Sequence, residues 1–184
     1  MEKSQNEAFR QLYIRRLEND EHIKSFDCGD EDLNDFILNQ SSLFNAEKLA
    51  VSYALENKEN KDVLAFFSLS NDKISINDFD DKNKYNRFSR RFNNRKRLKS
   101  YPAVKIGRLG VSNSMKGKML GTAIMNYIKS YFIRDNKSGC RFPTVDAYSD
   151  AIPFYQKNGF IPLNEADAKD KTRLLYFDLK DVSE

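Results

Sequence analysis

Residues Leu109–Thr122 read LGVSNSMKGKMLGT, and this stretch decides the fold. A β-rich run leads into a loop with Gly117, and the loop leads into a helical pattern near Gly121. This order directs free backbone N–H groups and the positive end of a helix dipole toward one spot. Glycines let the backbone approach a bound anion, so the stretch favours a nucleotide-containing cofactor with a pyrophosphate. A purely structural role, in which two glycines ease the helix into a tight corner, stays open at this point.

The spacing of this stretch excludes two common nucleotide motifs. A Walker A loop needs a glycine, four further residues, and then Gly-Lys followed by Ser or Thr. A dinucleotide-binding turn needs the pattern GxGxxG. Leu109–Thr122 contains neither pattern, so these two nucleotide-binding motifs are not indicated.

A second informative stretch, Ala151–Phe160, reads AIPFYQKNGF. It follows a predicted strand, and its aromatic pair, Phe154 and Tyr155, lies on a predicted short helix. Asn158 and Gly159 suit the end of that helix, because glycine readily adopts the left-handed conformation found there. Taken alone, this stretch is a helix with aromatic core contacts and a glycine cap.

Together, the two stretches resemble the GNAT family of acetyltransferases. The family's cofactor loop has Arg or Gln, two residues, Gly, one residue, and Gly or Ala, and Lys116–Gly121 occupies these positions here. Lys116 stands for Arg or Gln and still supplies a cation, whereas Met119 stands for the first motif glycine. A backbone N–H donates whatever side chain it carries, so the loop can still bind phosphates if Met119 turns its side chain away into the core. The second stretch resembles the family's Ala-x-x-Phe-Tyr and Gly-Phe signature, which matches at Ala151, Phe154, Tyr155, Gly159 and Phe160.

A third likeness concerns Phe26–Gln40, which reads FDCGDEDLNDFILNQ. It resembles the first helix of the small toxin-like GNAT branch, with its Phe-x-Cys-Gly and Leu-x-x-Phe patterns. The resemblance extends over Leu12–Leu179, with a polar, basic insertion at about residues 77–100. It implies a single GNAT domain over residues 1–184, of the α/β (α+β) class. The fold expected is a central mixed, mostly antiparallel sheet of six to seven strands flanked by about four helices.

The resemblance implies acetyl-CoA as the acyl donor, with no metal. Tyr155 is then the catalytic acid that protonates the departing CoA thiolate, since a phenol with a pKa of about 10 is protonated at neutral pH. The alternative for Tyr155 is a core aromatic residue with a hydrogen-bonded hydroxyl. The backbone near Gly110 or Val111 is expected to face the thioester carbonyl. The implied cofactor-binding residues are Leu109, Gly110, Val111, Lys116, Gly117, Lys118, Met119, Leu120, Gly121, Thr122, Phe154 and Tyr155.

The acceptor is expected to be a primary amine that the sequence does not identify. No general base stands out, because Lys105–Val111 contains no acidic residue and the single histidine, His22, lies in the N-terminal region. Asp146 and Asp150 are candidates for a base, although an aspartate at the end of a strand is more often a cap or turn residue. Tyr148 stands where many family members carry an Asn that contacts the cofactor.

Residues 87–99 contain seven basic residues and no acidic one. Toxin-like GNAT relatives acetylate the amino acid carried on transfer RNA, so the resemblance implies aminoacyl-tRNA as a candidate acceptor bound through this patch. A solvated helix face is the ordinary explanation of such a charge run. A catalytically inactive GNAT-fold module that binds acyl-CoA is a further alternative, to which Met119 points and against which Tyr155 argues.

Periodicity predicts the other elements. Asp30 is expected to cap a helix that reaches Gln40, and a helical excursion is expected within residues 77–100. The strands expected are Leu12–Leu17, Leu49–Leu55, Val63–Leu69 with a possible extension at Ile74–Ile76, Ala103–Val111, Pro143–Ala147 and Arg173–Leu179. The helices expected are Lys118–Ile133 and Tyr148–Lys157.

Length and composition fit one globular domain. The chain has 184 residues, of which 40% are hydrophobic and 32% charged, and this excludes an intrinsically disordered chain. Cys28 and Cys140 lie far apart and outside any CxxC pattern, so neither a disulfide framework nor a zinc site is predicted. With no apolar leader or span in the sequence, the predicted localisation is cytoplasmic. The oligomeric state, monomer or homodimer, and the presence of an antitoxin partner stay open.

Overall fold

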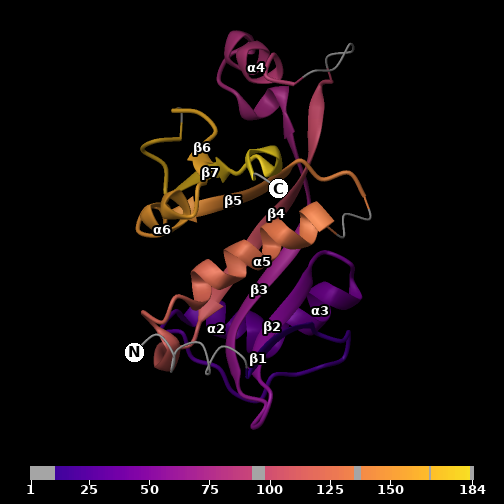
Figure 1. Ribbon diagram of the computed structural model, residues 1–184, viewed down its shortest axis with the longest axis vertical. Coiled ribbons are helices and arrows are strands. Elements are labelled where there is room, and N and C mark those ends of the chain that lie inside the picture. The colour runs from indigo at the N-terminus through magenta and orange to yellow at the C-terminus, as the bar shows by residue number, and fades with distance from the viewer. Residues whose placement is uncertain (1–10, 93–97, 135–137, 166, 183–184) are drawn as a thin grey trace. The chain divides into compact units, whose positions relative to one another are not determined.

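The computed structural model describes residues 11–92, 98–134, 138–165 and 167–182 (Figure 1). It divides into two compact units. Unit 1 comprises Met1–Ser70 and Gly107–Met125, and unit 2 comprises Asn71–Ile106 and Asn126–Glu184. The strands are β1 (Leu12–Arg16), β2 (Val51–Asn57), β3 (Val63–Ser75), β4 (Ser100–Val111), β5 (Phe142–Tyr148), β6 (Ile161–Pro162) and β7 (Thr172–Tyr176). The helices are α2 (Glu31–Asp35), α3 (Ser41–Ala46), α4 (Lys82–Ser89), α5 (Leu120–Arg134) and α6 (Ile152–Lys157).

The described strands form one seven-stranded sheet in the order β1-β2-β3-β4-β5-β7-β6. β4 and β5 are parallel. The pairs β1–β2, β2–β3, β5–β7 and β6–β7 are antiparallel. A π-helical turn, Phe36–Gln40, joins α2 to α3, so the described helices form four continuous bodies. The predicted fold class, a mixed and mostly antiparallel sheet with about four helices, is confirmed.

Several predicted boundaries were wrong at one end. The last strand ends at Tyr176 and not at Leu179, because Asp178 caps a 3-10 turn by accepting the Lys180 N–H at 3.0 Å. The helix predicted from Tyr148 begins only at Ile152, after a turn closed by the Ala151 N–H and the Tyr148 carbonyl. The remaining differences also lie at element ends: Leu49 precedes β2, Ile76 follows β3 in a 3-10 turn, and α5 begins at Leu120.

The core of unit 1 forms between the N-terminal helices and the sheet. Asp30 caps α2 as predicted, since its carboxylate accepts the Leu33 N–H at 3.0 Å. The π-helical turn that follows buries Phe36, which stacks on Phe66 of β3. Phe26 meets the same Phe66 ring edge to face at 5.2 Å. Aromatic packing therefore fixes the segment around Phe26 against β3.

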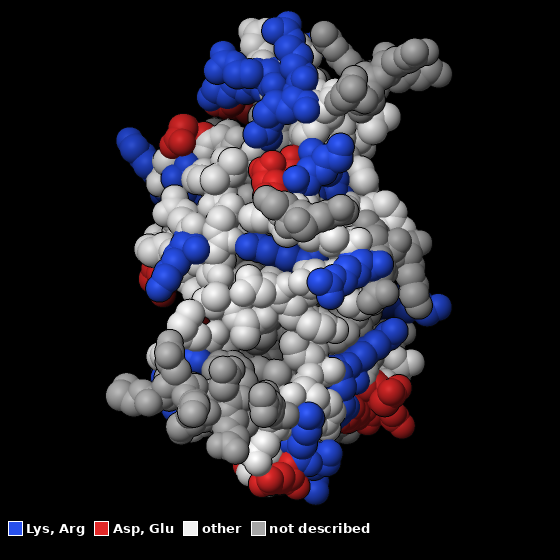
Figure 2. Space-filling model, viewed as in Figure 1, with Lys and Arg blue, Asp and Glu red and all other residues white. Residues whose placement is uncertain are grey.

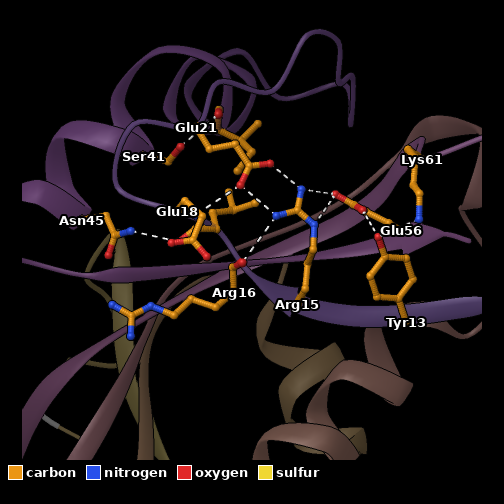
Figure 3. A network of polar contacts seen from close by, with 11 residues as sticks. Tyr13, Arg15, Arg16, Glu18, Glu21, Ser41, Asn45, Glu56 and Lys61 are labelled. Carbon is orange, nitrogen blue, oxygen red and sulfur yellow. Dashed lines mark hydrogen bonds and ion pairs between the residues drawn. The ribbon is translucent and has the colours of Figure 1, made fainter.

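A polar network holds the edge strand β1 to β2 (Figure 3). Arg15 of β1 donates to Glu56 of β2, with distances of 3.0 Å from Nε and 2.6 Å from Nη2, and it also pairs with Glu21. The Tyr13 hydroxyl donates to the second Glu56 oxygen at 2.6 Å. Hydrogen bonds from Arg15 lower the pKa of Glu21, so this carboxylate stays charged. Glu56 is only 3% exposed, and its burial is tolerated because both oxygens are hydrogen-bonded.

The core of unit 2 includes the segment that the sequence sets apart as an insertion. Asp81 caps α4 by accepting the Lys84 N–H at 3.0 Å, and α4 turns Tyr85 and Phe88 inward. These two rings pack in one cluster with residues from four strands and a loop, namely Ile74, Tyr101, Ala103, Phe142, Leu163 and Tyr176. Residues 82–89 therefore contribute to the core of unit 2 and are not only a polar surface segment.

No helix in the described ranges is long and apolar enough to cross a membrane. Among the same residues, no group of three or more His, Cys, Asp or Glu side chains has an arrangement suited to a metal ion.

Candidate functional site

The glycine loop, Ser112–Met119, links β4 to α5 within unit 1. Its first residue is anchored to the sheet, because the Ser112 N–H donates to the Leu64 carbonyl at 2.9 Å. A 3-10 turn, Asn113–Met115, follows, and Leu120 at the start of α5 is buried. Ser114 and Lys116 to Met119 are exposed. The loop is thus fixed at both ends and open to solvent between them.

The backbone of the glycine loop adopts the conformation that an anion cradle needs. Gly117 has φ +76°, and a Cβ added there would meet nothing within 4 Å. The first hydrogen bond of α5 is donated by the Ala123 N–H to the Met119 carbonyl at 3.0 Å. The N–H groups of Leu120, Gly121 and Thr122 precede this bond and belong to the unpaired first turn of the helix. Their partial positive charge suits a phosphate.

Met119 does not turn its side chain into the core, so the condition set for the loop from the sequence is not met in this way. Its side chain is 62% exposed, and its backbone has φ +62°, the left-handed region that glycine enters most easily. The residue that replaces the first motif glycine therefore keeps a glycine-like backbone. With the backbone in this left-handed conformation, the side chain points into solvent.

The regular alternation of residues between the two faces of the sheet is interrupted in β4 between Gly107 and Gly110. An added Cβ at Gly107 would lie 3.2 Å from Ser68 Oγ, and one at Gly110 would lie 2.6 Å from Phe66 Cε1. Phe66 and Ser68 are two residues apart in a regular part of β3, so they share a face. Gly107 and Gly110 are three residues apart, yet Gly107 approaches Ser68 and Gly110 approaches Phe66 on that one face. In a regular strand, residues three apart point to opposite faces, so β4 contains a one-residue shift of the β-bulge type between them. Such a shift reorients the backbone of Leu109 to Val111.

The pairing of β4 with β5 is short. In the described residues it is confined to Ala103, Val104 and Lys105, although β4 continues to Val111. The later part of β4 therefore carries backbone N–H and C=O groups that the ladder with β5 does not use. An extended ligand with amide groups can pair with such an edge.

The side chain of Lys116 lies against the N-terminal segment of unit 1. A Cβ added at Gly29 would come within 3.3 Å of Lys116 Nζ and 3.2 Å of Asn113 Oδ1. Gly29 itself has φ +79°, so the turn that carries it favours glycine both for its backbone and for the space it leaves. Lys116 and the exposed Lys118 are the two cations of the glycine loop.

Tyr155 lies on α6 in unit 2, in aromatic surroundings. It is 6% exposed, and its ring meets Phe154 at 5.1 Å and Phe160 at 5.6 Å between centroids. Burial raises the pKa of Tyr155 to about 12. Among the described residues its hydroxyl makes no hydrogen bond, so the alternative of a hydrogen-bonded core tyrosine lacks a partner group. Its role as proton donor stays a prediction.

The end of α6 is fixed as the sequence predicts. Gly159 has φ +83°, and its N–H donates to the Gln156 carbonyl at 2.9 Å. Lys129 of α5 donates to the Asn158 carbonyl at 2.6 Å and lies 4.0 Å from the centre of the Phe177 ring. A helix C-terminus and an aromatic face both attract a cation, so Lys129 stabilises the end of the helix that carries Tyr155.

The candidate bases differ in their surroundings. Asp146 is paired with Lys105 at 2.6 Å. Burial lowers the pKa of Lys105, but the hydrogen bond and charge of Asp146 more than offset this and raise it overall. Asp150, Tyr148 and His22 are exposed. Asp146 is thus engaged in an ion pair, and a base role for either aspartate stays a prediction.

Lys and Arg side chains gather in the region where α4 lies (Figure 2). Arg87, Arg90 and Lys99 are exposed. Arg91 is exposed as well, but its guanidinium lies over the Phe88 ring at 4.8 Å and donates to the Tyr176 hydroxyl at 2.6 Å. The rest of the predicted patch, Arg95, Lys96 and Arg97, lies outside the described residues.

Sequence reasoning missed the polar contacts that reach the glycine loop from the N-terminal segment. Asn113 donates through its side chain to Asp27 Oδ2 at 2.8 Å and through its backbone N–H to the Asp27 carbonyl at 2.9 Å. Asn34 of α2 donates to Asp27 Oδ1 at 3.0 Å. Asn113 lies 86 positions from Asp27 in the sequence, and Asn34 lies 7 positions from it. No local sequence pattern predicts the contact between Asn113 and Asp27.

Comparisons with known proteins agree with this geometry. Residues 93–179 match the acetyltransferase (GNAT) domain. No curated protein matches the chain. The solved structure of AtaT complexed with acetyl-methionyl-tRNAfMet is 26% identical, with a TM-score of 0.69 over 92% of this chain and 96% of that chain. The structure of AtaTR bound with acetyl-CoA is also 26% identical, with a TM-score of 0.69 over 94% and 96%.

A third structure, a mutant of the AtaT toxin bound to the C-terminus of the antitoxin AtaR and acetyl-CoA, is 24% identical. Its TM-score is 0.66 over 93% of this chain and 95% of that chain. The resemblance predicted from the sequence, including the likeness to the toxin-like branch, is confirmed.

Proposed function

We propose that the chain transfers the acetyl group of acetyl-CoA to the amino group of an aminoacyl-tRNA, because residues 93–179 match the acetyltransferase (GNAT) domain and the chain is similar in fold to the AtaT toxin. The observation that carries the proposal is the backbone of the glycine loop. Gly117 and Met119 both have positive φ angles, and the first turn of α5 follows directly. A pyrophosphate suits this arrangement, since the first turn of α5 leaves backbone N–H groups unpaired and the same loop carries the cations of Lys116 and Lys118.

Acetyl-CoA supplies an activated thioester, and the chain's own residues bind and orient it. The unpaired edge of β4 near Leu109 to Val111 offers backbone groups to the amides of the pantetheine arm. An N–H at Gly110 or Val111 polarises the thioester carbonyl. Phe154 contributes an apolar contact beside Tyr155.

Tyr155 supplies the proton that the departing CoA sulfur needs. Its hydroxyl is free of partners among the described residues, and burial raises its pKa to about 12. The phenol is therefore fully protonated at neutral pH and cannot act there as a base. An acid of this kind contributes roughly a hundredfold or more to the rate of such a step.

The choice of an α-amine as acceptor follows from the candidate bases. Asp146 is held by Lys105, and Asp150, the other candidate base, is exposed to solvent. An α-amine with a pKa of about 7.7–8.0 is roughly one third neutral at pH 7.5, whereas only about 0.1% of a lysine side chain with a pKa of about 10.4 is neutral. An enzyme without a strong base is better suited to the α-amine. AtaT, which is similar to this chain, was solved with acetyl-methionyl-tRNAfMet, a tRNA whose amino acid carries an acetyl group.

The exposed cations near α4 support a nucleic-acid acceptor. Arg87, Arg90 and Lys99 are free to meet phosphates, while Arg91 is held by the aromatic cluster and Tyr176. Phosphate contacts contribute affinity that falls with salt and carries little sequence information. The oligomeric state and an antitoxin partner stay predictions.

The first experiment is calorimetric titration of the purified protein with acetyl-CoA. The variant Gly121→Glu places a carboxylate in the first turn of α5, and we expect its acetyl-CoA binding to be lost. Ser130→Glu, an exposed position of the same helix, is the matched control and should bind normally. A well-folded native chain that does not bind acetyl-CoA would overturn the proposal and favour a different role for the GNAT fold.

The acceptor is tested by incubating the protein with labelled acetyl-CoA and charged tRNA, with uncharged tRNA and lysine-containing peptides as comparisons. Label on the amino acid of charged tRNA alone is the expected result. The double variant Arg87→Glu/Arg90→Glu should lower this activity and weaken its salt dependence, while acetyl-CoA binding stays unchanged. Lys24→Glu/Lys73→Glu changes the net charge equally at two exposed positions outside the basic run at residues 87–99 and serves as the control. Equal activity of the two double variants would exclude the α4 surface as the tRNA contact.

A further inference from the structure

A turn of the N-terminal segment, Phe26–Asp30, contacts the glycine loop through Asp27. The Asp27 carboxylate accepts three hydrogen bonds, from the Gly29 N–H at 2.8 Å, the Asn34 side chain at 3.0 Å and the Asn113 side chain at 2.8 Å. Its backbone carbonyl accepts a fourth, from the Asn113 N–H. One residue therefore joins α2, its own turn and the first residue of the 3-10 turn in the glycine loop.

The same turn is itself held rigidly. Phe26 is buried against Phe66, so the residue before Asp27 is fixed by the core. Asn34 holds the turn on both sides of the peptide that joins Asp27 to Cys28. Its Oδ1 accepts the Cys28 N–H at 2.9 Å, and its Nδ2 donates to the Asp27 carboxylate. The turn is a firm support and not a flexible segment that merely touches the loop.

The charge of Asp27 persists at neutral pH. Hydrogen bonds from the Gly29 N–H and from the side chains of Asn34 and Asn113 hold the pKa of Asp27 below its usual value. The side chain is exposed to solvent, so its contribution comes from orientation and not from a buried charge.

Asn113 is the point at which support for the glycine loop matters most. The loop is anchored to the sheet at Ser112 and to the core at Leu120, and the exposed residues between them include Lys116 and Gly117. Without a third anchor, this stretch would have to be ordered when a ligand binds, and ordering lowers affinity. Asp27 supplies that anchor beside the place where Lys116 lies against Gly29.

We propose that Asp27 is a positioning residue for donor binding, which acts through Asn113 to hold the glycine loop in the conformation that receives the pyrophosphate of acetyl-CoA. This inference rests on the proposed function. Asp27 itself does not touch the donor or the reacting atoms. The pair Asp27–Asn113 therefore changes the affinity for acetyl-CoA and leaves the rate of transfer from the bound donor nearly unchanged.

The test is a double-mutant cycle read by calorimetric titration with acetyl-CoA. Asp27→Ala and Asn113→Ala should each weaken binding about five- to tenfold, the range expected for one or two hydrogen bonds of ordinary strength. The double variant should be no weaker than the weaker single variant, because both changes remove the same contact. Asp27→Asn keeps the shape and can still bond to a rotated Asn113 amide, so it should stay within about twofold of the native affinity.

Asp35→Ala is the matched control. Asp35 is an exposed aspartate of α2 whose hydrogen bonds in the described residues go to Asn39 and Gln40. Its loss should leave acetyl-CoA binding unchanged. Thermal melting of every variant separates general destabilisation from loss of the anchor, since Asn113→Ala lies in an exposed loop and should hardly change Tm.

Three outcomes would overturn the inference: native affinity in both single variants, effects that multiply in the double variant, or a fall in kcat with KM for acetyl-CoA unchanged. Any of these would leave the proposed function standing. Absence of acetyl-CoA binding by the native protein would instead contradict the proposed function itself.

Discussion

The glycine loop and helix α6 serve the proposed reaction by different physical means. The glycine loop is exposed and works through its backbone, with left-handed residues at Gly117 and Met119 before the first turn of α5. Helix α6 is a short helix that buries Tyr155 among aromatic rings and works through that one side chain.

This difference predicts which departures from the family pattern a donor site of this kind can tolerate. Lys116 and Met119 depart from the pattern in the glycine loop, yet the positive φ angle at Met119 is kept. A backbone N–H donates whatever side chain it carries, so a backbone site survives such changes. A site that depends on one side-chain hydroxyl does not survive replacement of that residue. At this position the chain has Tyr155, which matches the family pattern.

The largest expected effect concerns the side-chain site. Tyr155→Phe removes the hydroxyl and leaves the ring packing against Phe154 and Phe160 in place. We expect kcat to fall about a hundredfold or more, because a general acid commonly contributes at least this much. Acetyl-CoA affinity, measured by calorimetry, should stay within about twofold. Tyr127→Phe on α5 is a control, and a loss of kcat below tenfold in Tyr155→Phe would contradict the acid role.

The pH profile of the native protein gives an independent measure of the same group. Burial raises the pKa of Tyr155 to about 12, so the phenol keeps its proton throughout the range in which the protein can be assayed. Activity should therefore rise as the acceptor amine loses its proton and should show no falling limb below about pH 10. A falling limb near pH 8 that disappears in Tyr155→Phe would contradict the raised pKa.

The next largest effect concerns Gly110 of β4, the strand that leads into the glycine loop. Gly110→Ala would bring a Cβ to 2.6 Å from Phe66 Cε1 and 3.3 Å from Phe26 Cε1, both inside the packed core of unit 1. Overpacking of this kind lowers the free energy of unfolding by about 1–3 kcal/mol, measured by urea denaturation. Gly139→Ala, where an added Cβ meets nothing within 4 Å, is the control and should leave stability unchanged. Unchanged stability in Gly110→Ala would mean that Phe66 can move aside freely.

The elements of the fold were predictable because each carries a local signal. The capping aspartate Asp30, the glycine cap at Gly159 and the amphipathic pattern of α5 follow from local propensities, and the structure bears all three out. The predicted end of the last strand was wrong because it also relied on local pattern alone. Asp178 caps a turn within a run of residues that has the pattern of a continuous strand. Local patterns identify elements well and their ends less well.

The support of the site was not predictable, because it depends on contacts between distant residues. Nothing near Asp27 in the sequence points to Asn113, which lies 86 positions away. The outward orientation of Met119 also escaped prediction, because a methionine in a loop gives no sign of a left-handed backbone. Likewise, the basic run at residues 87–99 gives no sign that Arg91 donates a hydrogen bond to Tyr176, a residue of the core of unit 2.

The smallest expected effect returns to the glycine loop. Met119 pays a steric penalty in the left-handed region of about 1–2 kcal/mol, and glycine avoids it but loses about 0.5–1 kcal/mol through the greater freedom of the unfolded chain. Met119→Gly should therefore raise the free energy of unfolding by about 0.5 kcal/mol, because the 62% exposed side chain has little packing to lose. Acetyl-CoA affinity should stay within about twofold, since the backbone already has the glycine-like conformation. Met119→Ala is the matched control, because it removes the long side chain but retains the Cβ and hence the strain. A gain in Met119→Gly that is absent from Met119→Ala would assign the effect to the backbone, whereas an equal change in both would assign it to the exposed side chain.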